Sequence, residues 1–204
     1  MKWMMAIGAV LAMPALVFGY VGTANFTLES SGNTSITIDP GDPFSLDIAI
    51  DWSGAENIYG DDAALTASTS NVFMMTSRTH GSGVSGNITA NRTDAVILSD
   101  ANKWLKTAAD ATQDLGGEFQ STEWTQNPLQ YSTIGIDSAD AIAPGVYTIT
   151  MGSPGLAGLN VLEGVGLEFM DTSSDTFTVT VTPEPASMLL LVGALPFLRR
   201  RRSA

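Results

Sequence analysis

Residues 39–51 read DPGDPFSLDIAID, a turn signal that leads directly into an alternating stretch. Proline, glycine and aspartate over 39–43 favour a tight turn. Beyond the turn, apolar residues alternate with polar or small ones, which is typical of a β-strand buried on one face. The apolar members are Phe44, Leu46, Ile48 and Ile50. The sequence therefore predicts a strand over 44–50 that packs on a core.

The same alternation recurs along the chain. Threonines alternate with apolar residues over 176–182, and residues 146–151 follow a Pro-Gly turn. A short helix is expected only over 99–110. Further strands are predicted over 25–30, 34–38, 71–77, 86–90, 95–98, 131–137 and 164–170. Many short strands joined by turn residues predict an all-β fold, an antiparallel β-sandwich of jelly-roll or immunoglobulin-like type.

Two segments are similar to cohesin-type sandwiches: the Pro-Gly-Asp turn with its strand at 39–51, and the strand entry APGVY at 143–147. Cohesin modules bind dockerins or act as structural surface modules. The resemblance therefore implies a sandwich domain over 25–182 with a binding or structural role. It carries over no dockerin-binding residues.

The composition excludes several classes of function. The 204 residues include no cysteine, so a disulfide scaffold, a thiolate zinc site and a cysteine nucleophile are ruled out. The formal net charge is −12, which argues against nucleic acid as a partner. Twenty of the 21 acidic residues fall within 25–182, against four basic residues, Arg78, Arg92, Lys103 and Lys106.

The N-terminal segment is predicted to be a secretory signal peptide over 1–24. Lys2 precedes an apolar stretch that ends in small residues, as export signals do. Cleavage after Ala24, with Gly22 at position −3, fits best, and cleavage after Gly19, with Val17 at −3, is the alternative.

The C-terminal segment combines a Pro-Glu-Pro motif, an apolar stretch and four arginines. The apolar residues 186–198 would form a helix about 20 Å long, shorter than the roughly 20 residues that span a bilayer. Arginines at its end favour a cytoplasmic location for that end. The pattern predicts a short transmembrane helix that tethers an exported domain.

Residues 183–204 resemble the PEP-CTERM sorting signal of Gram-negative bacteria, also known as the ice-binding protein C-terminal domain. The resemblance implies recognition and cleavage by an exosortase, a transient stay in the inner membrane, and release to the cell surface or extracellular matrix. It makes Pro183, Glu184 and Pro185 the sorting motif, and Arg199, Arg200, Arg201 and Arg202 the stop-transfer cluster. Thr182 and Pro196 depart from the usual pattern.

Motifs for chemistry within the body are weak. Gly81–Gly86 fits G-x-G-x-x-G, but a strand rather than a helix is expected after it, which excludes a dinucleotide site. A serine hydrolase would need its nucleophile in a G-x-S-x-G elbow, and neither Ser82 nor Ser85 fits that pattern. His80 is therefore expected to be a partly exposed histidine in a loop. The threonines of 176–182 are interpreted as a solvent-facing strand edge. Sequons begin at Asn25, Asn33, Asn87 and Asn91, where exposed loops are expected.

Carboxylates and aromatic residues leave three alternatives open. A glycosidase pair could come from Glu118, Glu123, Asp137 and Asp140. Ca²⁺ could bind Asp61 with Asp62, Asp137 with Asp140, or Asp171 with Asp175. Sugar rings could stack on Trp52, Tyr59, Trp104, Trp124 or Tyr131, although most of these are expected in the core or at its rim.

The leading hypothesis is a non-enzymatic structural or adhesive protein, with no catalytic residue, cofactor or metal ligand assigned. Its expected partners are the exosortase, the inner membrane, and exopolysaccharide or another surface protein. The alternative is a module that binds carbohydrate or a dockerin, and a glycoside hydrolase is less favoured.

Overall fold

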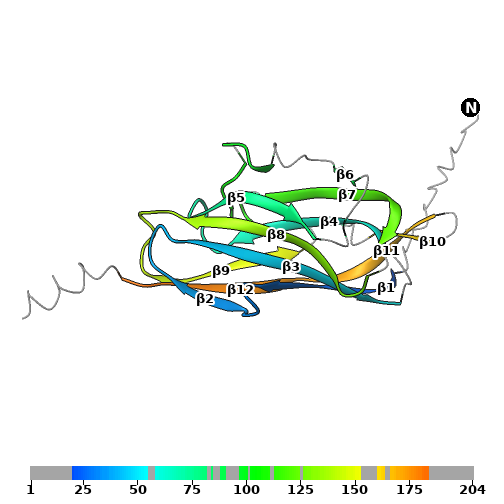
Figure 1. Ribbon diagram of the computed structural model, residues 1–204, viewed down its shortest axis with the longest axis horizontal. Helices are drawn as coiled ribbons and strands as arrows, with labels where there is room; N and C mark the ends of the chain where they lie inside the picture. The colour runs from blue at the N-terminus through cyan, green and yellow to red at the C-terminus, as the bar shows by residue number, and fades with distance from the viewer. Residues whose placement is uncertain are drawn as a thin grey trace, which may run out of the picture.

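The computed structural model describes residues 20–54, 58–81, 84, 88–90, 97–100, 102–110, 113–124, 126–152, 160–163 and 166–183. Twelve strands form a continuous sheet that folds over into a sandwich (Figure 1). Their order is β2-β12-β9-β4-β10-β11-β1-β3-β8-β5, and β7 pairs with β4 and β6. The predicted all-β sandwich is confirmed.

In chain order the strands are β1 Tyr20–Glu29, β2 Ser35–Ile38, β3 Pro43–Ser53, β4 Ile58–Ala67, β5 Phe73–His80, β6 Ile88–Ala90, β7 Gln113–Trp124, β8 Leu129–Ser138, β9 Gly145–Gly152, β10 Asn160–Glu163, β11 Gly166–Ser173 and β12 Asp175–Val181. Most neighbours pair antiparallel, whereas β1 with β11 and β2 with β12 pair in parallel.

The core lies between a layer containing β1, β3, β8 and β5 and a layer containing β2, β12, β9 and β4. Phe44 of β3 stacks on Phe177 of β12 across the interior, with ring centroids 6.2 Å apart. Phe73 of β5 meets both Phe44 and Tyr147 edge to face, at 5.9 and 5.8 Å. The alternating apolar residues of β3 and β12 therefore face each other, as their period-2 pattern requires.

The segment 102–107 runs along the open edge of β5 and corrects the predicted helix over 99–110. Its described residues form no such helix; the Ser99 carbonyl accepts the amides of Asn102 and Lys103, and the chain then extends beside β5. Met75 donates its amide to the Lys103 carbonyl, and Leu105 donates to the Phe73 carbonyl. The buried Leu105 anchors the segment, which covers the unpaired backbone groups of this edge.

Three strands were not predicted: β4, β7 and β10. Asp61-Asp62 interrupts the alternation of β4, and Gly116-Gly117 interrupts that of β7. β4 and β7 nonetheless pair with each other through their backbones, with Asp62 opposite Gly117. The strand predicted over 95–98 is wrong where it is described, because Ile97 is helical and Leu98 lies in a turn.

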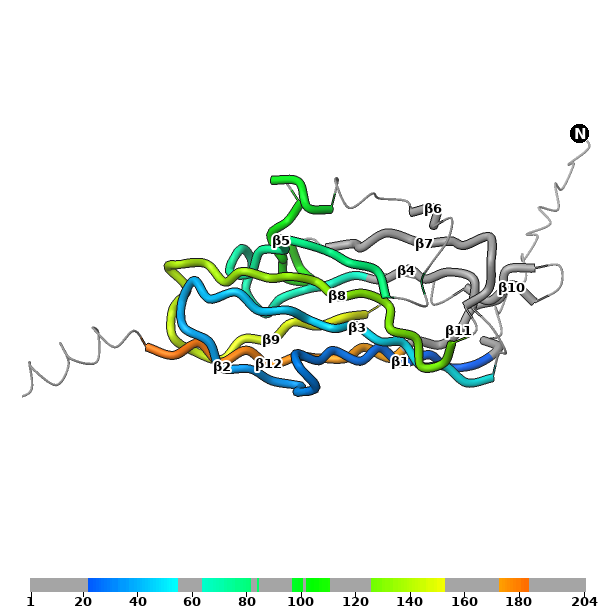
Figure 2. The backbone as a smooth tube through the Cα atoms, viewed as in Figure 1, coloured from blue at the N-terminus to red at the C-terminus, as the bar shows by residue number. Residues whose placement is uncertain are grey.

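The two ends of the sandwich chain lie at opposite ends of the long axis of the molecule. Figure 2 shows β1 beginning at one end and β12 finishing at the other. β1 starts at Tyr20, within the segment predicted to be removed as a leader. The part of the chain that the structure describes holds no helix long and apolar enough to cross a membrane. The predicted membrane helix at 186–198 lies outside that part.

Candidate binding face

The outer surface of β1, β3 and β8 is the candidate binding face, called here the β1–β3–β8 face. Alternation sends the apolar side chains of these strands into the core and the intervening ones outward. The face consists of Asn25, Thr27, Glu29, Ser45, Asp47, Ala49, Asp51, Ser53, Gln130, Thr133 and Asp137. It therefore carries four carboxylates and no basic side chain among these described positions.

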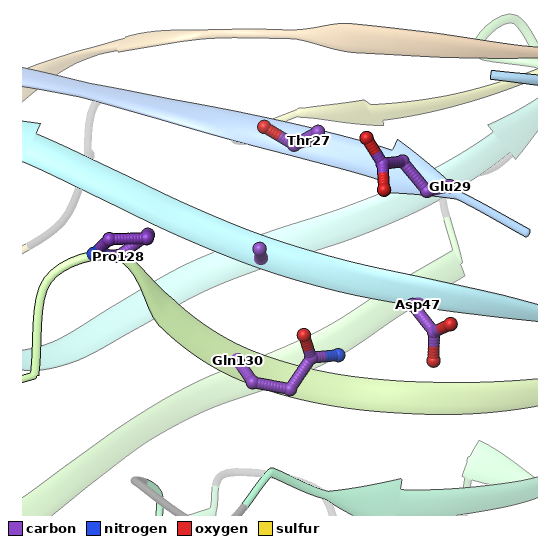
Figure 3. A pocket seen from close by; sticks show the side chains of 6 residues that line it. Thr27, Glu29, Asp47, Pro128 and Gln130 are labelled. Atoms are coloured by element: carbon purple, nitrogen blue, oxygen red, sulfur yellow. The ribbon is translucent and has the colours of Figure 1, made fainter. Parts of the chain in front are cut away.

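A shallow depression of about 240 Å³ lies in the middle of this face (Figure 3). Ala49 of β3 forms its floor, because the strand register places this small side chain between Thr27 of β1 and Gln130 of β8. Pro128 closes one end, and Glu29 and Asp47 line the other. A larger residue at position 49 would fill the hollow.

Two carboxylates stand side by side at the acidic end of the depression. Glu29 of β1 is directly opposite Asp47 of β3 in the antiparallel register. Like charges at directly opposed positions destabilise a sheet. Thr133 of β8 donates a hydrogen bond to Asp47 Oδ1 at 2.6 Å, which orients that carboxylate. The pair gives this end of the face a negative potential that attracts cationic groups.

The depression suits a single side chain or sugar hydroxyl better than a whole small molecule. Its volume is below the roughly 300–1,000 Å³ of ligand pockets, and its lining is open to solvent. Carboxylate oxygens accept hydrogen bonds, and the Gln130 amide can both donate and accept. An ammonium, a guanidinium or a hydroxyl from a partner surface would find acceptors here.

The predicted sorting residues fall at or beyond the end of the described chain. Pro183 is exposed and follows the last strand by two residues. Thr182 is tied back to β2, since its amide donates to the Ile38 carbonyl at 2.9 Å. The remaining members, Glu184, Pro185, Arg199, Arg200, Arg201 and Arg202, lie outside the described residues.

The glycosidase candidates are placed on strands that are not neighbours. Glu118 and Glu123 belong to β7, which pairs with β4 and β6. Asp137 belongs to β8, which pairs with β3 and β5, and Asp140 follows in the next turn. The sheet order therefore does not bring the two groups together as a catalytic pair.

The Ca²⁺ candidates form no ligand set in the described residues, where no three carboxylate or histidine side chains gather. Asp61 and Asp62 lie on β4, and Asp171 lies on β11. Asp175 instead holds the backbone, accepting the Leu28 amide on Oδ2 and the Thr176 amide on Oδ1, both at 2.7 Å. Its charge is thus used to join β12 to β1.

The aromatic residues with described side chains include core residues rather than an open sugar platform. Trp52 and Tyr131 are 5% and 0% exposed, as expected of core residues. Trp104 is half-buried and bridges to Met74 at the edge of β5. The side chains of Tyr59 and Trp124 lie outside the described part.

The glycine-rich motif begins with a packing requirement. A Cβ at Gly81 would stand 1.6 Å from the Gln130 carbonyl oxygen, so only glycine fits against β8. His80 ends β5 and is half-buried, which corrects its predicted place in a loop. Ser82 and Ser85 lie outside the described residues.

The sequons at Asn87 and Asn91 also lie outside the described residues. Asn33 is exposed in a turn, as predicted. Asn25 is exposed on β1 instead of in a loop, and its amide donates to Asp51 Oδ2 at 3.3 Å.

The threonine run of β12 corrects another prediction, because it does not lie on a strand edge. β12 is flanked by β9 and β2, and both neighbours carry hydroxyl residues in register. Thr176 is opposite Thr150, which is opposite Thr66 of β4, and the Thr150 and Thr176 hydroxyls lie 3.1 Å apart. Residues opposite one another on these strands thus form rows across the sheet. Thr148, Thr178 and Ser35 form a second row, and Val146, Thr180 and Thr37 form a third. The result is an uncharged outer surface across four strands.

The residues that line the depression were not singled out from the sequence, although one signal for them was available. The alternation of β3 already identified Asp47 and Ala49 as outward residues. The alternation does not show which strands flank β3, and this is known only from the pairing register of the sheet. Glu29 and Gln130 lie far apart in the sequence and meet across β3.

Comparison with known proteins supports the fold. No protein-family model matches the chain, and no curated protein does. The seventh ScaB type I cohesin from Pseudobacteroides cellulosolvens is similar at a TM-score of 0.53 and 13% identity, over 79% of this chain and 94% of that one. A cohesin in an OlpC cohesin–dockerin complex from Clostridium thermocellum has a TM-score of 0.49 and 8% identity, over 83% of this chain and 99% of that one. A Clostridium perfringens cohesin module from a family 33 glycoside hydrolase has a TM-score of 0.48 and 11% identity, over 80% of this chain and 99% of that one. The body has a cohesin-like fold.

Proposed function

We propose that this protein is an exported, non-catalytic module that binds a partner protein at the cell surface through its β1–β3–β8 face. The cohesin-like fold supports a binding role, because the cohesin modules that the sequence resembles at residues 39–51 and 143–147 bind dockerins. The partner proposed here is dockerin-like in the broad sense of a surface protein captured by a sandwich face. The leading sequence hypothesis, a purely structural or adhesive role, has less support than this alternative.

The chemistry of the face supports a partner with basic side chains. Glu29 and Asp47 form its acidic end, and Asp51 continues the negative charge along β3. Opposite charges across an interface accelerate association and set its orientation. A lysine or arginine of the partner would enter the depression and relieve the repulsion between Glu29 and Asp47.

The observation that carries the proposal is the hollow above Ala49, flanked by a like-charged pair. A purely structural sheet would gain stability from a larger or oppositely charged residue at these positions. By this argument, a small residue beside two opposed carboxylates would lower the free energy of unfolding of the free protein. Such a cost is consistent with a surface shaped for a partner.

The test compares partner capture by three forms of the full-length exported protein. Glu29→Gln with Asp47→Asn neutralises the face, and Asp100→Asn is the matched control at an exposed site elsewhere. Surface proteins of the host that bind the wild-type and D100N forms, but not the double variant, would establish the face as the binding site. Equal capture by all three forms would disprove the role of this face.

Carbohydrate is the second candidate ligand, favoured by the amide and hydroxyl groups of Gln130 and Thr27 in the depression. These groups can exchange hydrogen bonds with sugar hydroxyls. A glycan array probed with wild-type protein and with Gln130→Ala separates the two candidates. Sugar binding that is lost in Q130A would favour carbohydrate, whereas a blank array with intact protein capture would favour a protein partner.

The tail supports a proposal about location, on the strength of its sequence pattern. An exosortase would recognise Pro183, Glu184 and Pro185 while residues 186–198 and the arginine cluster hold the chain in the inner membrane. Cleavage would then release the domain to the cell surface or matrix. Pro183 is exposed beyond the last strand, where an enzyme can reach it. Replacing Pro183 and Pro185 by alanine should leave a longer, membrane-bound form, whereas Pro144→Ala should be processed normally.

A further inference from the structure

We propose that the leader is removed between Gly19 and Tyr20, so that the mature protein keeps the whole of β1. The inference rests on the proposed export of the chain. The pattern of small residues favours the bond after Ala24 and allows the bond after Gly19. The position of β1 in the sandwich reverses that preference.

Ala24 is part of the folded domain. Its side chain is 0% exposed and belongs to the hydrophobic core. It is paired on both sides, opposite Trp52 of β3 in the antiparallel ladder and opposite Thr172 of β11 in the parallel ladder. β1 is therefore an interior strand at this point, and cleavage after Ala24 would cut through it.

Cleavage after Ala24 would also leave two strands without their shared neighbour. Thr23 lies opposite Ser53, and the hydroxyls of these residues are 2.9 Å apart. Removing residues 20–24 would expose the backbone of β3 at Trp52 and Ser53, and that of β11 at its pairing positions with β1. Unpaired strand edges promote aggregation and lose their ladder hydrogen bonds. A new ammonium group at Asn25 would in addition stand within the sheet.

The bond after Gly19 has neither drawback. It lies directly before the first residue of β1, so its cleavage removes no strand residue. Gly19 at position −1 satisfies the preference of signal peptidases for small residues, and Val17 stands at position −3. Cleavage after Ala24 requires the segment to remain outside the sheet.

The experiment is to express the full chain with its own leader in a Gram-negative secretion host and to determine the N-terminus of the exported protein. Intact mass and N-terminal sequencing give the residue directly. A chain that starts at Tyr20 supports both the inference and export. A chain that starts at Asn25 overturns the inference and leaves export standing, whereas a chain that keeps Met1 and stays with the cells overturns both.

Two matched variants place a bulky side chain at one cleavage site at a time. Gly19→Leu blocks position −1 of the first bond, and Gly22→Leu blocks position −3 of the second. We expect G19L to accumulate as the uncleaved precursor and G22L to be cut before Tyr20 as in the wild type. The reverse result would overturn the inference. Because the readout is the mass of the N-terminal end, it does not depend on how well either variant folds.

Discussion

Asp175 at the start of β12 accepts a hydrogen bond on Oδ2 from the backbone amide of Leu28 in β1, with the donor nitrogen 2.7 Å away. The two residues are distant in the sequence, and no ladder joins their strands. The same carboxylate accepts the Thr176 amide on Oδ1. One side chain thus holds the last strand against the first.

Replacing Asp175 by alanine should lower the free energy of unfolding by about 1.5–3 kcal/mol, because hydrogen bonds to charged groups contribute about that much. Asp175→Asn keeps one acceptor oxygen and should lose less. Urea unfolding at neutral pH measures both, with Asp100→Asn as the control at an exposed carboxylate. Equal midpoints for D175A and D100N would contradict this role.

Phe177→Ala should be among the most destabilising single changes in the sandwich, at about 3–5 kcal/mol. Phe177 is 0% exposed and stacks on Phe44 of the facing layer, so its removal leaves a cavity between the layers. The neighbouring Thr178→Ala, on the outer face, should change stability by about 0.5 kcal/mol or less. Chemical denaturation of the two variants gives the comparison, and similar losses would mean that the interior is not packed as described.

Gly81→Ala and Gly145→Ala should behave differently although the chemical change is the same. A Cβ at Gly81 would overlap the Gln130 carbonyl oxygen, whereas at Gly145 the nearest atom, Tyr147 Cε2, is 3.8 Å away. We expect G81A to cost about 1–3 kcal/mol or more through forced backbone movement, and G145A to be tolerated. Thermal unfolding of the pair tests this, and an unaffected G81A would contradict the close approach of β5 and β8.

Neutralising Glu29 should stabilise the free protein at low ionic strength. Glu29→Gln removes one charge of the pair with Asp47, which is expected to contribute about 0.2–1 kcal/mol. The gain should shrink as salt is added, because the repulsion is screened. Asp100→Asn breaks an ion pair with Lys103 at 2.6 Å and should show no such gain. Unfolding at two salt concentrations distinguishes them, and a loss of stability in E29Q would refute the repulsion.

Acid should loosen the contact between the 102–110 segment and the turn before β5. Hydrogen bonds from Ser70 and Thr107 hold the pKa of the Asp110 carboxyl below its ordinary value. Because the folded pKa is lowered, the stabilisation is present above the ordinary aspartate pKa of about 4 and is lost as pH falls through the folded value. NMR titration of the Asp110 carboxyl should give a midpoint below that of an ordinary aspartate. Ser70→Ala should raise the midpoint, and an unchanged midpoint would contradict the assignment.

The sequence predicted the strands whose alternation is complete and missed those whose alternation is broken. β3 and β12 were identified because every second residue is apolar. β4 was missed because Asp61 and Asp62 are adjacent, and a period-2 pattern cannot contain two consecutive polar residues without ambiguity. Tertiary pairing with β7 and β9 stabilises it nevertheless.

The surfaces were less predictable than the strands, since a surface depends on which strands are neighbours. The run of β12 indicated that Thr176 and its successors point outward. It did not indicate that Thr150 and Thr66 stand in the same row. The depression above Ala49 depends in the same way on the residues that β1 and β8 bring to either side.

Under the proposed export, the two parallel pairings would determine when the domain can fold. β2 pairs with β12, and β1 pairs with β11. The first two strands therefore cannot form these ladders until the last two strands are available. A chain that crosses a membrane with its N-terminus first cannot complete either ladder until residues 166–181 have emerged. Such a high contact order slows folding. Translocation would therefore be nearly complete before the sandwich closes, and the chain would pass through a secretion channel in an extended, unfolded form.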